Sequence, residues 1–156
     1  FKETFVTLKR HVSSGNSSRM EYLGRYEQHV YMNLLEDMSN MFYETFYFNQ
    51  DLSSWDVSKV FSMREMFHSC EKFNQPLNNW DVSNVKEMSY MFCSAKQFNQ
   101  PIDKWKIHDN CEVYAMFYCA NNFYQDISKF KIKSPREERK EDENYQELVN
   151  GSSLLI

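Results

Sequence analysis

The side chains of this chain that could support acid–base or nucleophilic chemistry are four histidines and four cysteines. They are His11, His29, His68, His108, Cys70, Cys93, Cys111 and Cys119. No two cysteines form a C-x-x-C pair of the kind that structural zinc sites use, and no histidine stands at a spacing that supports a His-Cys nucleophile pair. Three glycines in total are too few for a glycine-rich phosphate loop. We therefore expect no catalytic residue, no metal site and no cofactor.

The elements that would position any site follow from a repeat of 25 residues in the middle of the chain. Phenylalanine, tryptophan and a Met-Phe pair all recur at this interval, as in Phe48, Phe73, Phe98 and Phe123, or Trp55, Trp80 and Trp105. A fixed period of about 20–50 residues is typical of a solenoid, in which each unit packs mainly on its neighbours. The question of function then becomes which surface the stacked units present.

The first part of each repeat predicts a short strand. In the unit 73–97, Trp80, Asp81 and Val82 alternate between apolar and polar side chains, as expected of a strand with one face in the core. Stacked units would align these strands about 4.8 Å apart in a parallel sheet. Trp80 and Val82 then point inward, and Asp81 points to solvent.

The second part of each repeat predicts a short helix. From Val85 to Ala95 the apolar residues lie three and four positions apart, which is the spacing of one helix face. Asn84, followed three residues later by Glu87, has the form of a capping box. The expected fold class is therefore α/β: a short leucine-rich-repeat-like solenoid, with parallel strands on one face, short helices on the other, and N- and C-terminal caps.

The domain boundaries follow from where the repeat fades. We expect an N-terminal cap helix and loop at 1–21, the repeat solenoid at 22–133, and a charged C-terminal tail at 134–156. The units of the solenoid are expected near 22–47, 48–72, 73–97 and 98–122, with a partial unit at 123–133. No apolar run approaches the ~18–20 residues of a membrane helix, so no membrane span is expected in this segment.

Two groups of residues that could suggest chemistry have simpler structural interpretations. Asparagine and glutamine recur in the return loop, as in Asn49, Asn74 and Asn99, and we expect their amides to satisfy backbone groups there rather than to bind a ligand. Cys70 falls at the repeat position of two alanines, Ala95 and Ala120, so we expect a buried small side chain. A disulfide between Cys93 and Cys119 is compatible with neighbouring units, but free thiols are the expectation.

The repeat closely resembles that of the BspA-like leucine-rich-repeat surface proteins, with the pattern F-N-Q-P-L-x-x-W-D-V-S-N-V-x-x-M-x-x-M-F-x-x-A. Residues 73–95 match it almost letter for letter and residues 48–72 nearly as well, whereas residues 98–122 replace Asp-Val-Ser by Lys106-Ile107-His108. The resemblance implies a leucine-rich-repeat-like fold and a role in binding or adhesion rather than catalysis. It also implies a cell-surface location, with an intracellular or virion-associated location left open by the mostly unpaired cysteines.

The outward positions of the expected strands change from neutral or acidic to basic along the stack. In the last two units these positions hold Lys104, Lys106, His108, Lys129, Lys131 and Lys133. These six residues, called here the lysine face, form a candidate partner-binding face for phosphate or for an acidic segment of another protein chain. The alternative is a solvated face on which lysine prevents edge-to-edge pairing. The net charge of −4 argues against specific nucleic-acid binding by the whole chain.

The sequence therefore predicts a non-catalytic, protein-binding repeat module of the adhesion or surface-protein type. The alternative is a structural subunit embedded in a large assembly, such as a minor capsid-type component of a virion or an organelle complex. Aromatic residues that fall out of the repeat register would favour this alternative if other chains bury them. They are Phe61, Tyr90, Tyr114, Tyr118 and Tyr124.

Overall fold

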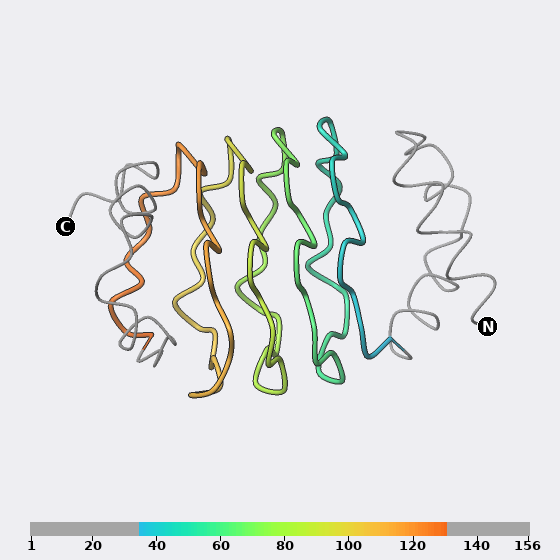
Figure 1. The fold of residues 1–156 in the computed structure, drawn as a ribbon, viewed down its shortest axis with the longest axis vertical. Helices are drawn as coiled ribbons and strands as arrows, with labels where there is room; N and C mark the ends of the chain where they lie inside the picture. Colours follow the sequence, from blue (N-terminus) through green and yellow to red (C-terminus); the bar gives the residue numbers. More distant parts are fainter. Residues whose placement is uncertain (1–34, 131–156) are drawn as a thin grey trace.

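The computed structural model describes residues 35–130 as a stack of coils of chain that lie side by side (Figure 1). One side of each coil, called here the ladder segment, comprises residues 36–46, 61–71, 86–96 and 111–121 in the first to fourth coils. The other side, called the tryptophan segment, comprises residues 49–58, 74–83, 99–108 and 124–130. Each coil therefore has one ladder segment followed by one tryptophan segment.

The predicted fold class is wrong. Residues 35–130 contain no helix and no extended strand, and their only β-type pairings are isolated parallel bridges, Asp37 with Ser62, Ser62 with Glu87, and Glu87 with Glu112. The chain is thus not an α/β, leucine-rich-repeat-like solenoid with parallel strands on one face and short helices on the other. The physical reason lies in how each side of the coil bonds to its neighbours.

The stretch predicted to be helical carries hydrogen bonds between coils instead. Alternate amide groups of one ladder segment donate to carbonyl groups of the next segment at 2.7–3.0 Å. Between the third and fourth segments the donors are Met88, Tyr90, Phe92 and Ser94, and the acceptors are Glu112, Tyr114, Met116 and Tyr118. A helix would direct each amide to the carbonyl four residues earlier in its own segment, so the ladder and the helix exclude each other.

Tight turns, rather than a helix, produce the apolar spacing of three and four. The amide of Met91 donates to the carbonyl of Met88 at 3.1 Å, and that of Ala95 donates to Phe92 at 3.0 Å. The first and fourth residues of both turns are fully buried in the core, whereas the third residues of both turns are only partly buried. A row of turns therefore places apolar side chains in the core at helix-like intervals.

The third residues of these turns adopt a positive φ, as in a type II turn. Tyr90 has φ 59° and Ser94 has φ 58°, and the other members of the set are Asn40, Glu44, Glu65, Ser69, Ala115 and Cys119. None is glycine, so each left-handed residue costs roughly 1–2 kcal/mol. The ladder bonds and the packed core offset this cost.

The expected capping box is also wrong. Glu87 Oε1 accepts a hydrogen bond from the amide of Ser89 at 2.6 Å, two residues later. The side-chain amide of Asn84 donates to the carbonyl of Ser58 on the preceding coil at 2.7 Å. Both side chains therefore support turns and coil contacts instead of a helix start.

The tryptophan segments, predicted as strands, are held together by side chains. The indole Nε1–H of Trp80 donates to the carbonyl of Leu52 at 3.0 Å, and that of Trp105 donates to Leu77 at 2.9 Å. Within residues 35–130 no backbone–backbone hydrogen bond joins neighbouring tryptophan segments. The inward and outward alternation nevertheless holds, because Trp80 and Val82 are buried and Asp81 is exposed.

The return loop between the two sides contains the expected amide ladder, and this prediction is confirmed. The side-chain carbonyl of Asn49 accepts a hydrogen bond from the amide of Asn74 at 2.9 Å. Asn74 accepts in the same way from Asn99 at 3.0 Å, and Asn99 accepts from Tyr124 at 3.0 Å. These asparagines are therefore structural parts of the stack.

Two columns of phenylalanine rings run through the core. In one column, Phe42, Phe67, Phe92 and Phe117, neighbouring ring centroids are 5.4–5.5 Å apart. In the second column, Phe48, Phe73, Phe98 and Phe123, neighbouring ring centroids are 5.7–5.9 Å apart. Cys70 lies buried beside these columns, as predicted, and its Sγ–H donates to the carbonyl of Phe42 at 3.0 Å. All four cysteines are free.

Several predictions lie outside the described residues. They are the cap helix and loop at 1–21, the beginning of the repeat region, the end of the partial unit at 131–133 and the charged tail at 134–156. Between residues 35 and 130, the structure contains no helix long and apolar enough to cross a membrane.

Candidate interaction surface

The described members of the lysine face are all exposed. Lys104, Lys106 and His108 lie on the tryptophan segment of the third coil, and Lys129 lies on that of the fourth. Buried Trp105 separates Lys104 from Lys106, which turns both lysines to solvent. Lys131 and Lys133 are outside the described residues.

Contacts with the second coil fix the backbone beneath this face. The amide of Lys104 donates to Asn78 Oδ1 at 3.0 Å, and the side-chain amide of Asn78 donates to Asp103 Oδ1 at 2.9 Å. Trp105 adds its indole bond to Leu77. The ammonium group of Lys104 is thus presented from a fixed backbone and is not needed to hold the coils together.

The third coil departs from the earlier coils where Lys106 and His108 replace aspartate and serine. In the second coil, Asp81 Oδ1 accepts a hydrogen bond from the amide of Ser83 at 3.1 Å. Hydrogen bonds from Ser83 hold the pKa of Asp81 below its usual range, and Ser58 does the same for Asp56. These two carboxylates therefore stay ionised, whereas the third coil carries a lysine at the equivalent position.

In the third coil, His108 makes a side-chain hydrogen bond to the backbone two residues later, as Asp81 does in the second coil. Its Nδ1 accepts a hydrogen bond from the amide of Asn110 at 3.1 Å, which requires Nδ1 to be unprotonated. The next tight turn moves one residue along the chain, because Cys111 donates to the carbonyl of His108 at 2.9 Å. Cys111 is consequently buried and Asn110 is exposed. The local backbone of the third coil therefore differs from that of the second.

The described lysine face is not uniformly basic. Exposed carboxylates stand among its lysines in the sequence, at Asp103, Asp109 and Asp126. Hydrogen bonds from Ser128 lower the pKa of Asp126, which therefore remains ionised at neutral pH. Opposite charges close together weaken a long-range field, so this face carries no uniform positive potential.

The out-of-register aromatic residues divide into two groups. Phe61 and Tyr124 are exposed, at 48% and 59%, whereas Tyr90, Tyr114 and Tyr118 are half-buried. Sequence reasoning missed Phe46 and Tyr47, which are 47% and 85% exposed. The sequence did indicate their exposure, because the later coils have charged and amide residues at these two repeat positions.

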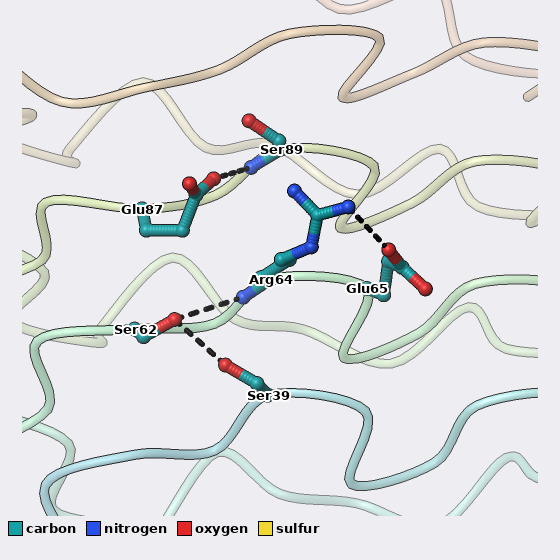
Figure 2. Close-up of polar contacts among 6 residues, drawn as sticks. All are labelled: Ser39, Ser62, Arg64, Glu65, Glu87 and Ser89. Atoms are coloured by element: carbon teal, nitrogen blue, oxygen red, sulfur yellow. Dashed lines mark hydrogen bonds and ion pairs between the residues drawn. The ribbon is translucent and has the colours of Figure 1, made fainter.

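The ladder side carries a second group of polar and aromatic residues that the sequence did not single out. Ser39 Oγ lies 2.7 Å from Ser62 Oγ, and the guanidinium of Arg64 lies 2.8 Å from Glu65 Oε1; both contacts are drawn in Figure 2. The same guanidinium lies 5.6 Å from the ring centre of Tyr90, within cation–π range. Arginine and tyrosine are common in protein interfaces, so this group is a second candidate contact surface.

Three of the four cysteines are poorly suited to nucleophilic chemistry. Burial raises the pKa of Cys70 and of Cys111 to about 12, and it raises the pKa of Cys93 as well. A thiol with a raised pKa forms little thiolate at neutral pH. Within residues 35–130, no group of three or more histidine, cysteine, aspartate or glutamate residues could hold a metal ion.

Comparison with known proteins places most of the chain in one family. Residues 20–139 match a family described as "Mycoplasma protein of unknown function, DUF285". No curated protein and no solved structure matches the chain. The matched region covers well over half of the 156 residues. The chain therefore belongs to the DUF285 family.

Proposed function

We propose that this chain is a non-catalytic protein-binding module. The observation that carries the proposal is a contrast between repeated polar side chains and the lysines of the third coil. Those that recur every 25 residues, such as Asn74 and Trp80, are engaged in contacts between coils. Lys104 and Lys106, which depart from the repeat, are exposed, and their side chains make no contact between coils within residues 35–130.

The finer proposal is a surface or adhesion role. It is supported by the resemblance of residues 73–95 to the repeat of the BspA-like surface proteins. A repeated scaffold with variable exposed positions suits recognition of another protein, because each coil can change its outward residues without losing its core. The lysine face then binds an acidic segment of the partner through direct ion pairs.

A defined acidic probe tests the lysine face. Fluorescein-labelled hexaglutamate is titrated with the chain, and binding is followed by fluorescence anisotropy, with hexalysine as the opposite-charge probe. Lys104→Glu, Lys106→Glu and Lys129→Glu are combined in one variant. Lys59→Glu, Lys72→Glu and Lys86→Glu form the matched control, because these lysines are also exposed but lie outside the face.

The expected result is binding of hexaglutamate that the face variant loses and the control variant keeps. Binding should also weaken between about 50 mM and about 500 mM salt, because screening shortens the reach of exposed charges. Equal loss in both triple variants would instead mean that only net charge matters. Undiminished binding by the face variant would contradict a role for the lysine face.

A structural subunit of a larger assembly is the second candidate, and the exposed aromatic residues favour it. Tyr47 is 85% exposed, and Phe46, Phe61 and Tyr124 are about half exposed, as expected of side chains that a permanent partner covers. The test is side-chain labelling of these residues in the isolated chain and in cell extracts. Protection only in the extract, together with a stoichiometric complex, supports the assembly role, and equal labelling in both contradicts it.

A further inference from the structure

Two cysteines depart from the repeat in consecutive coils on the ladder side. Cys93 stands in the third coil, where the other coils have tyrosine or histidine, and Cys119 stands in the fourth coil, where the others have glutamate or serine. Within residues 35–130, Cys70 and Cys111 belong to the apolar core cluster, whereas Cys93 and Cys119 do not. Packing of the core therefore does not account for these two thiols.

The two thiols lie in equivalent tight turns, one coil apart. Cys93 is the second residue of a turn in the third coil, and Cys119 is the third residue of the equivalent turn in the fourth coil. Ser94, which follows Cys93, has φ 58°, and Cys119 has φ 57°. The two turns therefore have the same backbone form, and Cys119 occupies the position of Ser94 on the next coil.

The ladder places Cys93 and Cys119 diagonally next to each other. The amide of Ser94 donates to the carbonyl of Tyr118 at 2.7 Å, so the two turns lie directly against each other. Hydrogen-bonded neighbouring segments are about 4.8 Å apart, and successive Cα atoms are about 3.8 Å apart. The Cα atoms of Cys93 and Cys119 are therefore about 6 Å apart, which is within the range of natural disulfides.

The side chain of Cys93 leans toward the position from which Cys119 extends. Cys93 Sγ lies 3.9 Å from Ser94 Oγ, and Cys119 is the counterpart of Ser94 on the next coil. Burial raises the pKa of Cys93, and the charge of a Cys119 thiolate raises it further, as expected of two sulfur atoms that are close together. Both thiols are free in this structure, so it shows the reduced form of the pair.

We propose that Cys93 and Cys119 are an oxidation site, at which a low-molecular-weight disulfide such as oxidised glutathione joins the two sulfur atoms. Cys119 reacts first, because it is partly exposed and Cys93 is only 5% exposed. The Cys119 thiolate attacks one sulfur of the reagent, forms a mixed disulfide and releases a glutathione thiolate. Cys93 then loses its proton to solvent and attacks the Cys119 sulfur, and a second glutathione thiolate leaves. Two protein thiols are oxidised and one reagent disulfide is reduced.

Proximity compensates for the weak acidity of Cys93 in the second step. A thiol with a raised pKa forms little thiolate at neutral pH. The attack of Cys93 is nevertheless intramolecular, and two correctly held groups react as if each were present at a very high concentration. Cys70 and Cys111 are at most 1% exposed, so the reagent does not reach them in the folded chain.

The new bond links the third coil to the fourth covalently. It closes a loop of chain from Cys93 to Cys119, and closing a loop of this length removes conformational freedom mainly from the unfolded chain. The oxidised chain should therefore unfold at a temperature about 5–10 °C higher than the reduced chain. Reduction of the bond should reverse this shift.

Treatment of the full, folded chain with oxidised glutathione tests the proposal. The reaction is stopped with acid, the remaining thiols are alkylated in denaturant and counted by mass, and the cross-linked peptides are mapped. The expected product is a single chain with a bond between Cys93 and Cys119 and with free thiols at Cys70 and Cys111. Its unfolding temperature should be raised and should return to the starting value with dithiothreitol.

Two serine variants test the order of the steps. Cys93→Ser should stop at the mixed disulfide, with glutathione held on Cys119 and without the rise in unfolding temperature. Cys119→Ser removes the accessible thiol, so its three remaining cysteines should stay free. Serine is the residue of the second and third coils at this position, so we expect the Cys119→Ser variant to fold normally.

Four results would overturn the proposal. A wild-type chain that does not react would show that Cys119 is inaccessible. A wild-type chain that keeps glutathione on Cys119 beside a free Cys93 would show that the two sulfur atoms do not meet. A bond from Cys119 to any other cysteine, in the same chain or in a second copy, would show a different pairing. A bond between Cys93 and Cys119 without a higher unfolding temperature would show that it does not hold the two coils together.

Discussion

The two sides of each coil are held to their neighbours by different chemical groups. On the ladder side the backbone makes the contacts, so the side chain at a given position can vary: the position of Arg64 is serine in the first and third coils and tyrosine in the fourth. On the tryptophan side, side chains such as Trp80 and Asn74 make the contacts. The residue type is therefore constrained on the tryptophan side, where side chains make the contacts between coils. It can vary on the ladder side, where the backbone makes them.

The largest expected effect comes from removing an indole bond on the tryptophan side. Trp80→Phe deletes the indole donor to the Leu52 carbonyl, which then keeps only its turn hydrogen bond from the amide of Trp55, and it leaves a smaller ring in the core. The lost hydrogen bond and the cavity left by the smaller ring should together cost about 2–3 kcal/mol in the free energy of unfolding. Denaturant titration of the variant measures it. A loss below about 0.5 kcal/mol, typical of an uninvolved surface site, would contradict the role assigned to the indole.

The return loop should respond to a change of a single acceptor. Asn74→Ala removes the oxygen that accepts from the Asn99 amide and from Gln100 Nε2, so we expect a loss of about 1–2 kcal/mol. Asn74→Asp keeps the oxygen and is the matched control. Thermal unfolding of both variants checks the prediction, which fails if alanine and aspartate give equal stability.

Glycine at the third position of a tight turn should raise stability on the ladder side and lower it on the tryptophan side. Ser94 on the ladder side has φ 58°, and Ser94→Gly should stabilise the chain by about 0.5–1 kcal/mol because glycine adopts this conformation without strain. Ser54, in the turn closed by Trp55 and Leu52, has no positive φ. Ser54→Gly should therefore destabilise it by a similar amount, and the same sign at both sites would refute the comparison.

The smallest effect at neutral pH is expected at Cys70, where the difference appears only in alkali. Burial raises its pKa to about 12 from the ordinary 9.0. Between these values the unfolded chain loses the thiol proton and the folded chain keeps it, so stability falls as pH rises above about 9. Cys70→Ala, which copies Ala95, should reduce this fall and change little below pH 9. Unfolding measured across this pH range checks it, and identical curves would contradict it.

The sequence predicted which residues face the core but not the backbone that places them there. Val85, Met88, Met91 and Phe92 are buried as expected. Their spacing suits a helix face and equally a row of tight turns with inward first and fourth residues. Whether the segment forms a helix or a row of turns depends on ladder hydrogen bonds to the next coil. These bonds join residues 24 apart, so no pattern within a single segment predicts them.

The candidate surface was predictable to the extent that alternation decides it. Lys104 and Lys106 are exposed because Trp105 between them is buried. The one-residue move of the turn after His108 was not predictable, because it depends on Cys111, rather than Asn110, filling the core. Exposure of Phe46 and Tyr47 could have been found by comparing their repeat positions across coils.

The most direct test of the ladder is a measurement of which carbonyl accepts from the amide of Tyr90. Scalar coupling across hydrogen bonds, measured by NMR on the labelled chain, identifies the acceptor. We predict coupling from Tyr90 N to the carbonyl carbon of Tyr114 on the next coil. Coupling instead to Lys86, four residues earlier as in a helix, would contradict the ladder and restore the helical interpretation of this segment.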